Sequence, residues 1–161
     1  MFEMKKIQAS GKDQLYAELL THAKGLLHDE HDLVANAANF SALLYHSLPD
    51  LNWVGFYFMK DGGLLVGPFQ GKPACVHIAL GKGVCGTAAQ KRETQVVPDV
   101  NKFPGHIFCD GDSLSELVVP LVKDGTLLGV LDLDSPKLAR FDQEDKQGLE
   151  ALAEAFLESL P

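Results

Sequence analysis

Basic residues are scarce in this sequence. Its 161 residues include 14 Lys and Arg against 22 Asp and Glu, which gives a formal net charge of −8. A nucleic-acid or anionic-membrane partner needs a basic face, so we expect neither. No apolar run approaches the length of a membrane span. The charged segment from Met1 to Lys6 has no apolar stretch after it, so we expect no secretory signal and a cytoplasmic protein.

Cysteine is also rare, and the chain contains only Cys75, Cys85 and Cys109. An odd number in a reducing compartment argues against structural disulfides and favours catalytic or redox-sensing thiols. None belongs to a Cys-x-x-Cys pair, which a structural zinc site usually needs, so we expect no metal and no other cofactor. His77 and His106 lie near Cys75 and Cys109, and a mixed metal site is the minority alternative.

Internal repeats, linkers and low-complexity tracts are absent too, so we expect one domain over residues 1–161. Leucines at helical spacing predict N-terminal helices within about 10–48, the first capped near Ser10 and the second beginning at Asp32. Asp142 should cap a final helix over about 142–159.

The middle of the chain, about 52–135, has the pattern of strands and turns. We expect strands at 53–59, 64–67, 74–79, 94–97, 117–122 and 126–134, and a short helix over 81–91. Residues 98–115 show little periodicity, and a connection of that length usually forms a functional loop. Helices at both ends of five or six mostly antiparallel strands predict an α+β fold with one sheet.

The surroundings of the cysteines favour reactivity. Cys109 lies between His106 and Asp110 in the irregular loop, where a depressed thiol pKa is expected. Cys85 lies one turn into the short helix, and the helix dipole there also favours a thiolate. A lone cysteine is more often an inert buried residue, but three in 35 residues favour thiol redox chemistry.

Acidic residues at the end of the last strand form a second candidate group. Side chains alternate along a strand, so Asp132 and Asp134 should share a face with Leu128 and Val130. Counting back from the hairpin turn places Glu116 close to the level of Asp132. Converging carboxyls raise one another's pKa, so one of them can stay protonated near neutral pH. The alternative is that these acids simply lie at a solvent-exposed strand end.

Two further features have ordinary explanations when taken alone. A single tryptophan on a strand, here Trp53, is usually core packing. The glycines of 81–86 lack the full spacing of a phosphate loop, so they more simply serve the tight entry into the short helix.

Several motifs together resemble the free methionine-(R)-sulfoxide reductases, a family with the GAF-domain fold. The resemblance covers nearly the whole chain and rests on the segments Trp53–Tyr57, Gly67–Cys75, Gly81–Gly86, Val97–Val100, Phe103–Ile107, Cys109–Asp110, Ser113–Pro120 and Leu131–Ser135. It implies a single GAF domain with a six-stranded, mostly antiparallel sheet flanked by helices. It also implies a homodimer.

The resemblance implies an enzyme that reduces free L-methionine-(R)-sulfoxide through a sulfenic acid and an intramolecular disulfide, with thioredoxin as reductant. By this likeness Cys109 is the nucleophile, Cys75 the principal resolving thiol and Cys85 an auxiliary or alternative one. The acids Glu116, Asp132 and Asp134 match those that hold the substrate and assist protonation, and Trp53 matches an aromatic wall facing the S-methyl group. Phe108 stands where the resemblance implies a smaller residue, a departure that bears on access to the pocket and not on the chemistry.

Two alternatives stay open at this point. A GAF module could bind a small ligand without chemistry, because one fold hosts many functions. A redox or metal sensor could use the same cysteines. Binding alone gives no reason for three cysteines around a loop that bears His106 and Asp110, and this favours the enzyme.

Overall fold

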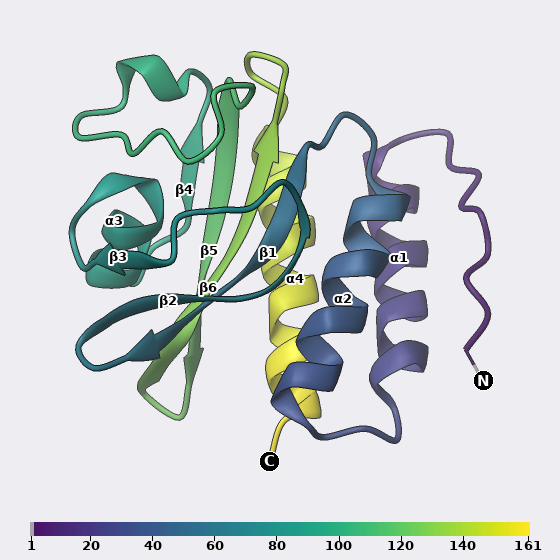
Figure 1. The fold of residues 1–161 in the computed structure, drawn as a ribbon. Coiled ribbons are helices and arrows are strands. Elements are labelled where there is room, and N and C mark those ends of the chain that lie inside the picture. Colours follow the sequence, from purple (N-terminus) through teal and green to yellow (C-terminus); the bar gives the residue numbers. More distant parts are fainter. Residues whose placement is uncertain (1) are drawn as a thin grey trace.

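Six strands form one curled antiparallel sheet in the computed structural model, which describes residues 2–161 (Figure 1). Their order across the sheet is β3-β2-β1-β6-β5-β4, and every neighbouring pair is antiparallel. The strands are β1 (Trp53–Lys60), β2 (Gly63–Gly71), β3 (His77–Ala79), β4 (Gln95–Val97), β5 (Ser115–Lys123) and β6 (Thr126–Ser135). The predicted α+β class and six-stranded sheet are confirmed.

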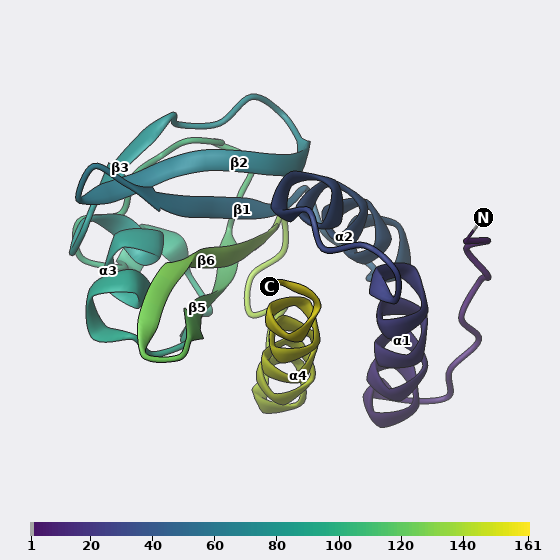
Figure 2. The same cartoon turned by 90° about the horizontal axis from the view of Figure 1, so that it is seen from below.

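Two helices, α2 (Leu33–Ser47) and α4 (Gln143–Ser159), cover one face of the sheet, and α1 (Lys12–Leu27) packs against these two helices (Figure 2). Apolar stripes of α2 and α4 meet the inward side chains of β1, β5 and β6, with the rings of Phe40, Phe56 and Phe156 at the centre of the contact. This layer is the main hydrophobic core.

The opposite face carries α3 (Gly83–Lys91) and the long loop between β4 and β5 (Figure 1). The loop contains one short 3₁₀ helix, Val100–Lys102, which confirms the predicted irregular segment. A second apolar cluster lies between this layer and the sheet, and the cysteines and buried acids lie on the same side. The functional chemistry is therefore separated from the main core by the sheet.

The helix caps follow the sequence with one exception. Asp32 accepts a hydrogen bond from the backbone of Ala35, and Asp142 forms a reciprocal capping box with Asp145. At α1 the N-cap is Gly11, without a side-chain cap, so the prediction of Ser10 was wrong by one position.

The predicted bounds of β2 and β3 differ from those observed. The strand β2 continues to Gly71, because its pairing with β1 extends to Trp53. The strand β3 is limited to His77–Ala79, shorter than the predicted 74–79, because the chain before it diverges from the sheet.

A bulge changes the register of the last hairpin. Leu121 pairs with Gly129 but Val122 pairs with Leu127, so Leu128 is the extra residue of β6. Leu128 consequently packs toward the main core, whereas Val130 lies in the second cluster. The prediction that Leu128 shares a face with Asp132 and Asp134 was therefore wrong.

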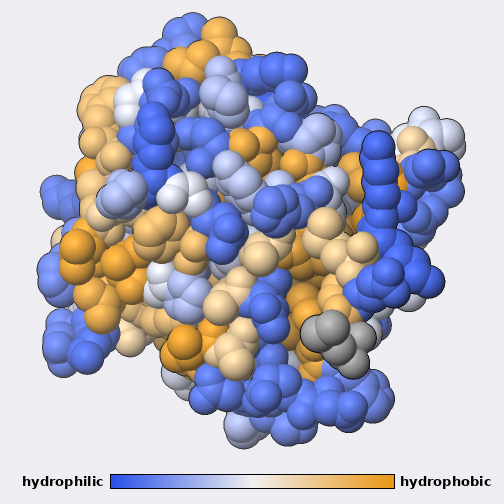
Figure 3. Space-filling model, turned by 45° about the vertical axis from the view of Figure 1, so that its right-hand side comes forward, coloured by the Kyte–Doolittle hydropathy of each residue, from blue (hydrophilic) through white to orange (hydrophobic). Residues whose placement is uncertain are grey.

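Among residues 2–161, none of the helices is long and apolar enough to cross a membrane. On the face drawn in Figure 3, hydrophobic side chains reach the surface in several places between hydrophilic ones.

Candidate active site

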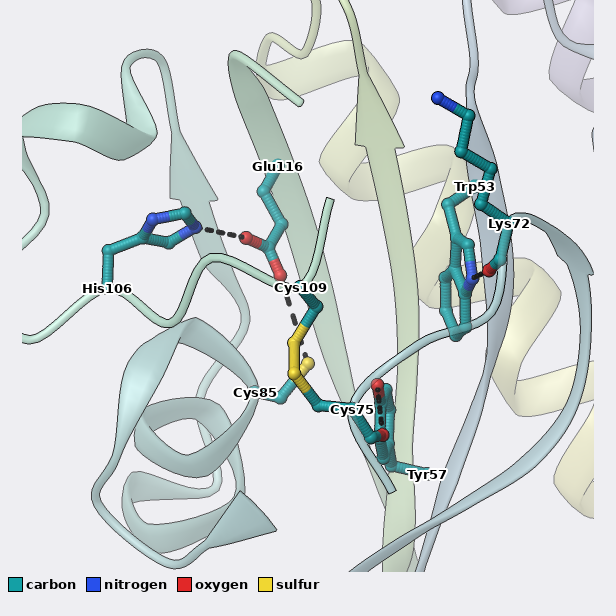
Figure 4. The surroundings of a disulfide bond; sticks show 8 residues. All are labelled: Trp53, Tyr57, Lys72, Cys75, Cys85, His106, Cys109 and Glu116. Atoms are coloured by element: carbon teal, nitrogen blue, oxygen red, sulfur yellow. Dashed lines mark hydrogen bonds and ion pairs between the residues drawn. A yellow bond between two sulfur atoms is a disulfide. The ribbon is translucent and has the colours of Figure 1, made fainter. Parts of the chain in front are cut away.

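A disulfide joins Cys75 and Cys109, whose Cα atoms are 5.4 Å apart (Figure 4). It links the segment between β2 and β3 to the long loop between β4 and β5. Both cysteines are half-buried, so the bond lies at the boundary between the pocket and solvent. A thiol from another molecule can approach a disulfide in this position.

Polar contacts hold the long loop against the rest of the site. The ammonium of Lys72 lies 2.6 Å from the carboxylate of Asp112 and ties together the two segments that the disulfide joins. The side-chain amide of Asn52 donates to Asp110 Oδ2 at 3.2 Å and to Ser113 Oγ at 3.0 Å. The loop is thereby positioned from the residue just before β1.

Cys85 is the free cysteine among the described residues and lies buried at the start of α3. Its sulfur is 3.8 Å from Glu116 Oε1. Burial raises the thiol pKa well above its usual value, and the nearby charges of Asp132 and Glu116 raise it further. The predicted thiolate at this position was therefore wrong, because desolvation and acidic neighbours outweigh the helix dipole.

Three carboxyl groups converge in the pocket, as the alternation of β6 predicted. Glu116 is directly opposite Asp134 in the β5–β6 ladder, one diagonal step from Asp132 and not level with it. Cys85, Glu116 and Asp132 each place a ligand atom within 4.8 Å of the others. A thiol and two carboxyls at this spacing could hold a cation, either a metal ion or an ammonium group.

The environment separates the acidities of these carboxyls. Burial raises the pKa of Glu116 well above its usual value, and the charges of Asp132 and Asp134 raise it further. Burial and the charge of Asp132 similarly raise the pKa of Asp134. Burial raises the pKa of Asp132 to about 6. Asp132 is therefore the most acidic of the three, and burial favours the protonated forms of Glu116 and Asp134.

His106 faces Glu116 and not the disulfide (Figure 4). Its Nε2 lies 3.9 Å from Glu116 Oε2, and its side chain is 8 % exposed. Burial lowers the histidine pKa, so the ring is neutral at pH 7. The structure does not support the predicted role of His106 in depressing the pKa of Cys109; it places His106 beside a candidate acid.

Two stacked aromatic side chains form one wall of the pocket. The rings of Trp53 and Tyr57 are 5.8 Å apart at their centroids. Trp53 Nε1 donates to the carbonyl of Lys72, and the Tyr57 hydroxyl donates to the carbonyl of Cys75. Tyr57 was absent from the predicted site, although its position four residues after Trp53 places both on the same face of β1.

These groups line one cavity of about 40 Å³, room for roughly three water molecules. All the predicted site residues lie on its wall except Cys75, which closes its edge through the disulfide. Phe108 does not line it, because its side chain points outward and is 67 % exposed. Phe108 therefore does not narrow the cavity itself.

Residues 16–158 match the GAF domain family. The free methionine-R-sulfoxide reductase of Escherichia coli K12 is 50% identical over 141 residues, covering 88% of this chain and 86% of its own. The enzyme of the same name from Saccharomyces cerevisiae is 47% identical and covers 92% of this chain and 87% of its own. The chain belongs to the free methionine-R-sulfoxide reductase family.

A solved member of this reductase family has nearly the same backbone. The free methionine-R-sulfoxide reductase of Neisseria meningitidis, crystallised with its substrate, superposes with a TM-score of 0.94 at 43% identity. The match covers 99% of this chain and 95% of that one. The expected GAF fold and the resemblance drawn from the motifs are both confirmed.

Proposed function

We propose that this protein reduces free L-methionine-(R)-sulfoxide to L-methionine with its own thiols as the immediate reductant. The observation on which this rests is the Cys75–Cys109 disulfide at the edge of a pocket that contains three buried acids. The reaction requires thiols that can be oxidised to a disulfide, and groups that bind the substrate ammonium and donate a proton. This site has both. The E. coli and yeast relatives carry the name of this activity.

Chemistry begins with Cys109 as a thiolate, which attacks the sulfoxide sulfur. The oxygen is a poor leaving group until it is protonated, and Glu116 is the proposed donor because burial raises its pKa and so favours its protonated form. The bond between Cys109 Sγ and the substrate sulfur then breaks together with the substrate S–O bond, so that the oxygen passes to Cys109 as a sulfenic acid and methionine leaves as the thioether. Two electrons pass from Cys109 to the substrate.

Cys75 then attacks the sulfenic acid, and a disulfide and one water molecule form. The bond observed between Cys75 and Cys109 supports Cys75 as the resolving thiol. Cys85 is left an auxiliary role, since its raised pKa makes it a poor nucleophile. An external dithiol such as thioredoxin returns two electrons and two protons, which suits a cytoplasmic protein.

Recognition of the free amino acid follows from the charges in the pocket. Asp132, ionised at neutral pH, is the proposed partner of the substrate ammonium. Backbone N–H groups of the 98–115 loop are the proposed partners of its carboxylate, and Trp53 is the proposed contact of the S-methyl group. A methionine sulfoxide within a protein lacks both charges, so it would lose both interactions.

Turnover with dithiothreitol as reductant tests the proposal. We expect methionine from free L-methionine-(R)-sulfoxide, and at least about a hundredfold lower kcat/KM for the N-acetylated substrate, which has no ammonium. The S epimer is the stereochemical control. No turnover by the wild type would refute the enzyme, whereas turnover retained by Cys109→Ser would refute only the choice of nucleophile. The homodimer remains a prediction that light scattering would test.

A further inference from the structure

Two large hydrophobic side chains lie exposed directly beside the two disulfide cysteines. Val76 follows Cys75 and is 52 % exposed, and Phe108 precedes Cys109 and is 67 % exposed. Only seven large hydrophobics are exposed among residues 2–161, so the position of two of them here is unusual. Neither lines the pocket, and the reaction of the amino acid gives them no task.

The two exposed residues lie close together on either side of the disulfide. Consecutive Cα atoms are 3.8 Å apart, so the Cα atoms of Val76 and Phe108 lie within about 13 Å of each other across the disulfide. The ring of Phe108 stands edge-on to His106, with centroids 4.6 Å apart, so one edge of it is packed and the rest is exposed. The exposed Lys72–Asp112 ion pair joins the same two segments and supplies a polar border.

We propose that Val76 and Phe108 form an apolar collar that docks the dithiol protein reducing the Cys75–Cys109 disulfide. That this disulfide forms during turnover rests on the proposed function. An apolar centre with a polar rim is the usual anatomy of a protein interface, and a few aromatic anchors supply most of its affinity. The occupant must present a reactive thiol, because the collar surrounds the bond to be broken.

The partner protein supplies the electrons that reduce the disulfide. Its thiolate attacks one sulfur of the Cys75–Cys109 bond, forms a mixed disulfide and releases the other cysteine as a thiolate. Its second thiol then attacks the mixed disulfide and frees the remaining cysteine. The partner is oxidised by two electrons and this protein is reduced by two. A small dithiol performs the same chemistry without needing the collar.

The test compares two reductants on protein that has first been oxidised to the disulfide. Reduction by thioredoxin is followed through NADPH oxidation with thioredoxin reductase, and reduction by dithiothreitol through release of thiols. We expect Phe108→Ala to lower the second-order rate with thioredoxin about tenfold, and Val76→Ala about threefold, with the dithiothreitol rate unchanged. Val34→Ala is the matched control, because Val34 is 61 % exposed but lies on α2 across the sheet.

Three results would overturn the collar. The first is an unchanged rate of reduction by thioredoxin in both variants, and the second is an equal loss of rate with both reductants. The third is dissociation of a dimer by Phe108→Ala in light scattering, because the surface would then be a contact between copies of this chain. No methionine sulfoxide enters these assays. Failure of the proposed function is therefore seen separately, in turnover by the wild type.

Discussion

At the scale of single residues, Glu116 is a group whose negative charge the fold opposes. Burial and its acidic neighbours raise its pKa well above the usual value. A carboxyl with a higher pKa in the folded than in the unfolded protein contributes stability that is complete below the unfolded pKa. That stability is lost as pH rises toward the folded pKa. The acid that serves the proposed proton transfer therefore costs stability at neutral pH.

Replacing Glu116 by Gln should remove this cost along with the proton donor. We expect the free energy of unfolding of Glu116→Gln, relative to wild type, to be higher at pH 8 than at pH 5 by at least about 1–2 kcal/mol, because only the wild type must retain a buried proton as the pH rises. Denaturant titration of the oxidised proteins measures this. Glu154→Gln, exposed on α4, is the control and should change neither value. Equal effects of Glu116→Gln at both pH values would contradict the account.

Asp132 should behave differently, because its pKa of about 6 leaves it ionised at pH 7. If it holds the substrate ammonium, KM should rise as pH falls through about 6, where Asp132 takes up a proton. Asp132→Asn should raise KM at pH 7.5 by about tenfold to a hundredfold and remove that inflection. Steady-state kinetics from pH 5 to 8 measure both. An unchanged inflection in Asp132→Asn would assign it to another group.

The sequence predicts the acids of the site better than the residues around them. Asp132 and Asp134 could be placed on one face because strand alternation is local. The contact between His106 and Glu116 could not be predicted, since His106 lies in a loop whose path depends on Asn52 and on the disulfide. Long-range contacts of this kind leave no signal in spacing.

At the scale of elements, α1 and α4 meet where Gly148 faces Tyr16. A Cβ at Gly148 would lie 2.2 Å from the Tyr16 ring. The ring cannot move freely, because the Tyr16 hydroxyl donates to the buried Asp145 at 2.7 Å. The Asp145 carboxylate also forms ion pairs with Lys12 at 2.6 Å and with Arg140 at 3.2 Å. One buried carboxylate therefore joins the N-terminal helix to the C-terminal one.

Alanine at Gly148 should destabilise the protein although alanine favours helices. We expect Gly148→Ala to lower the free energy of unfolding by about 1–3 kcal/mol, because the added methyl group overpacks the helix contact. Gly25→Ala is the matched control: Gly25 is also in a helix, its nearest contact would be 3.9 Å away, and the change should stabilise by about 0.5–1 kcal/mol. Denaturation curves compare the two. Stabilisation by Gly148→Ala would contradict this packing.

The bulge in β6 could not be predicted from the alternation of side chains along the strand. Strand alternation placed Leu128 with Val130, but Gly129 lies so close to β1 that a Cβ there would be 2.0 Å from the carbonyl oxygen of Tyr57. This approach accompanies the extra residue and the change of face. The caps at Asp32 and Asp142 were predictable because they depend on neighbours three residues away.

At the scale of the whole molecule, the disulfide and the pocket form one system. The pocket of the oxidised protein has room for roughly three water molecules, whereas methionine sulfoxide has about ten non-hydrogen atoms. The disulfide ties the two segments that enclose this space. We therefore expect reduction of the bond to open the pocket.

Substrate should bind to the reduced protein and not to the oxidised one. Trp53 is the only tryptophan and lines the pocket, so its fluorescence reports occupancy directly. We expect a saturable change when reduced Cys109→Ser, which cannot turn over, is titrated with the sulfoxide, and no change with oxidised wild type. Reduced wild type titrated with the product methionine is the control for the reporter. Equal binding to both redox forms would show that the bond does not govern access.

The most direct test of the central claim is a single turnover by reduced Cys75→Ser, which lacks the proposed resolving thiol. The account predicts one equivalent of methionine per protein, and mass spectrometry after dimedone trapping should place a sulfenic acid on Cys109. Wild type treated in the same way should contain the Cys75–Cys109 disulfide. Methionine formed with the label on Cys85, or no methionine at all, would contradict Cys109 as the residue that attacks the sulfoxide.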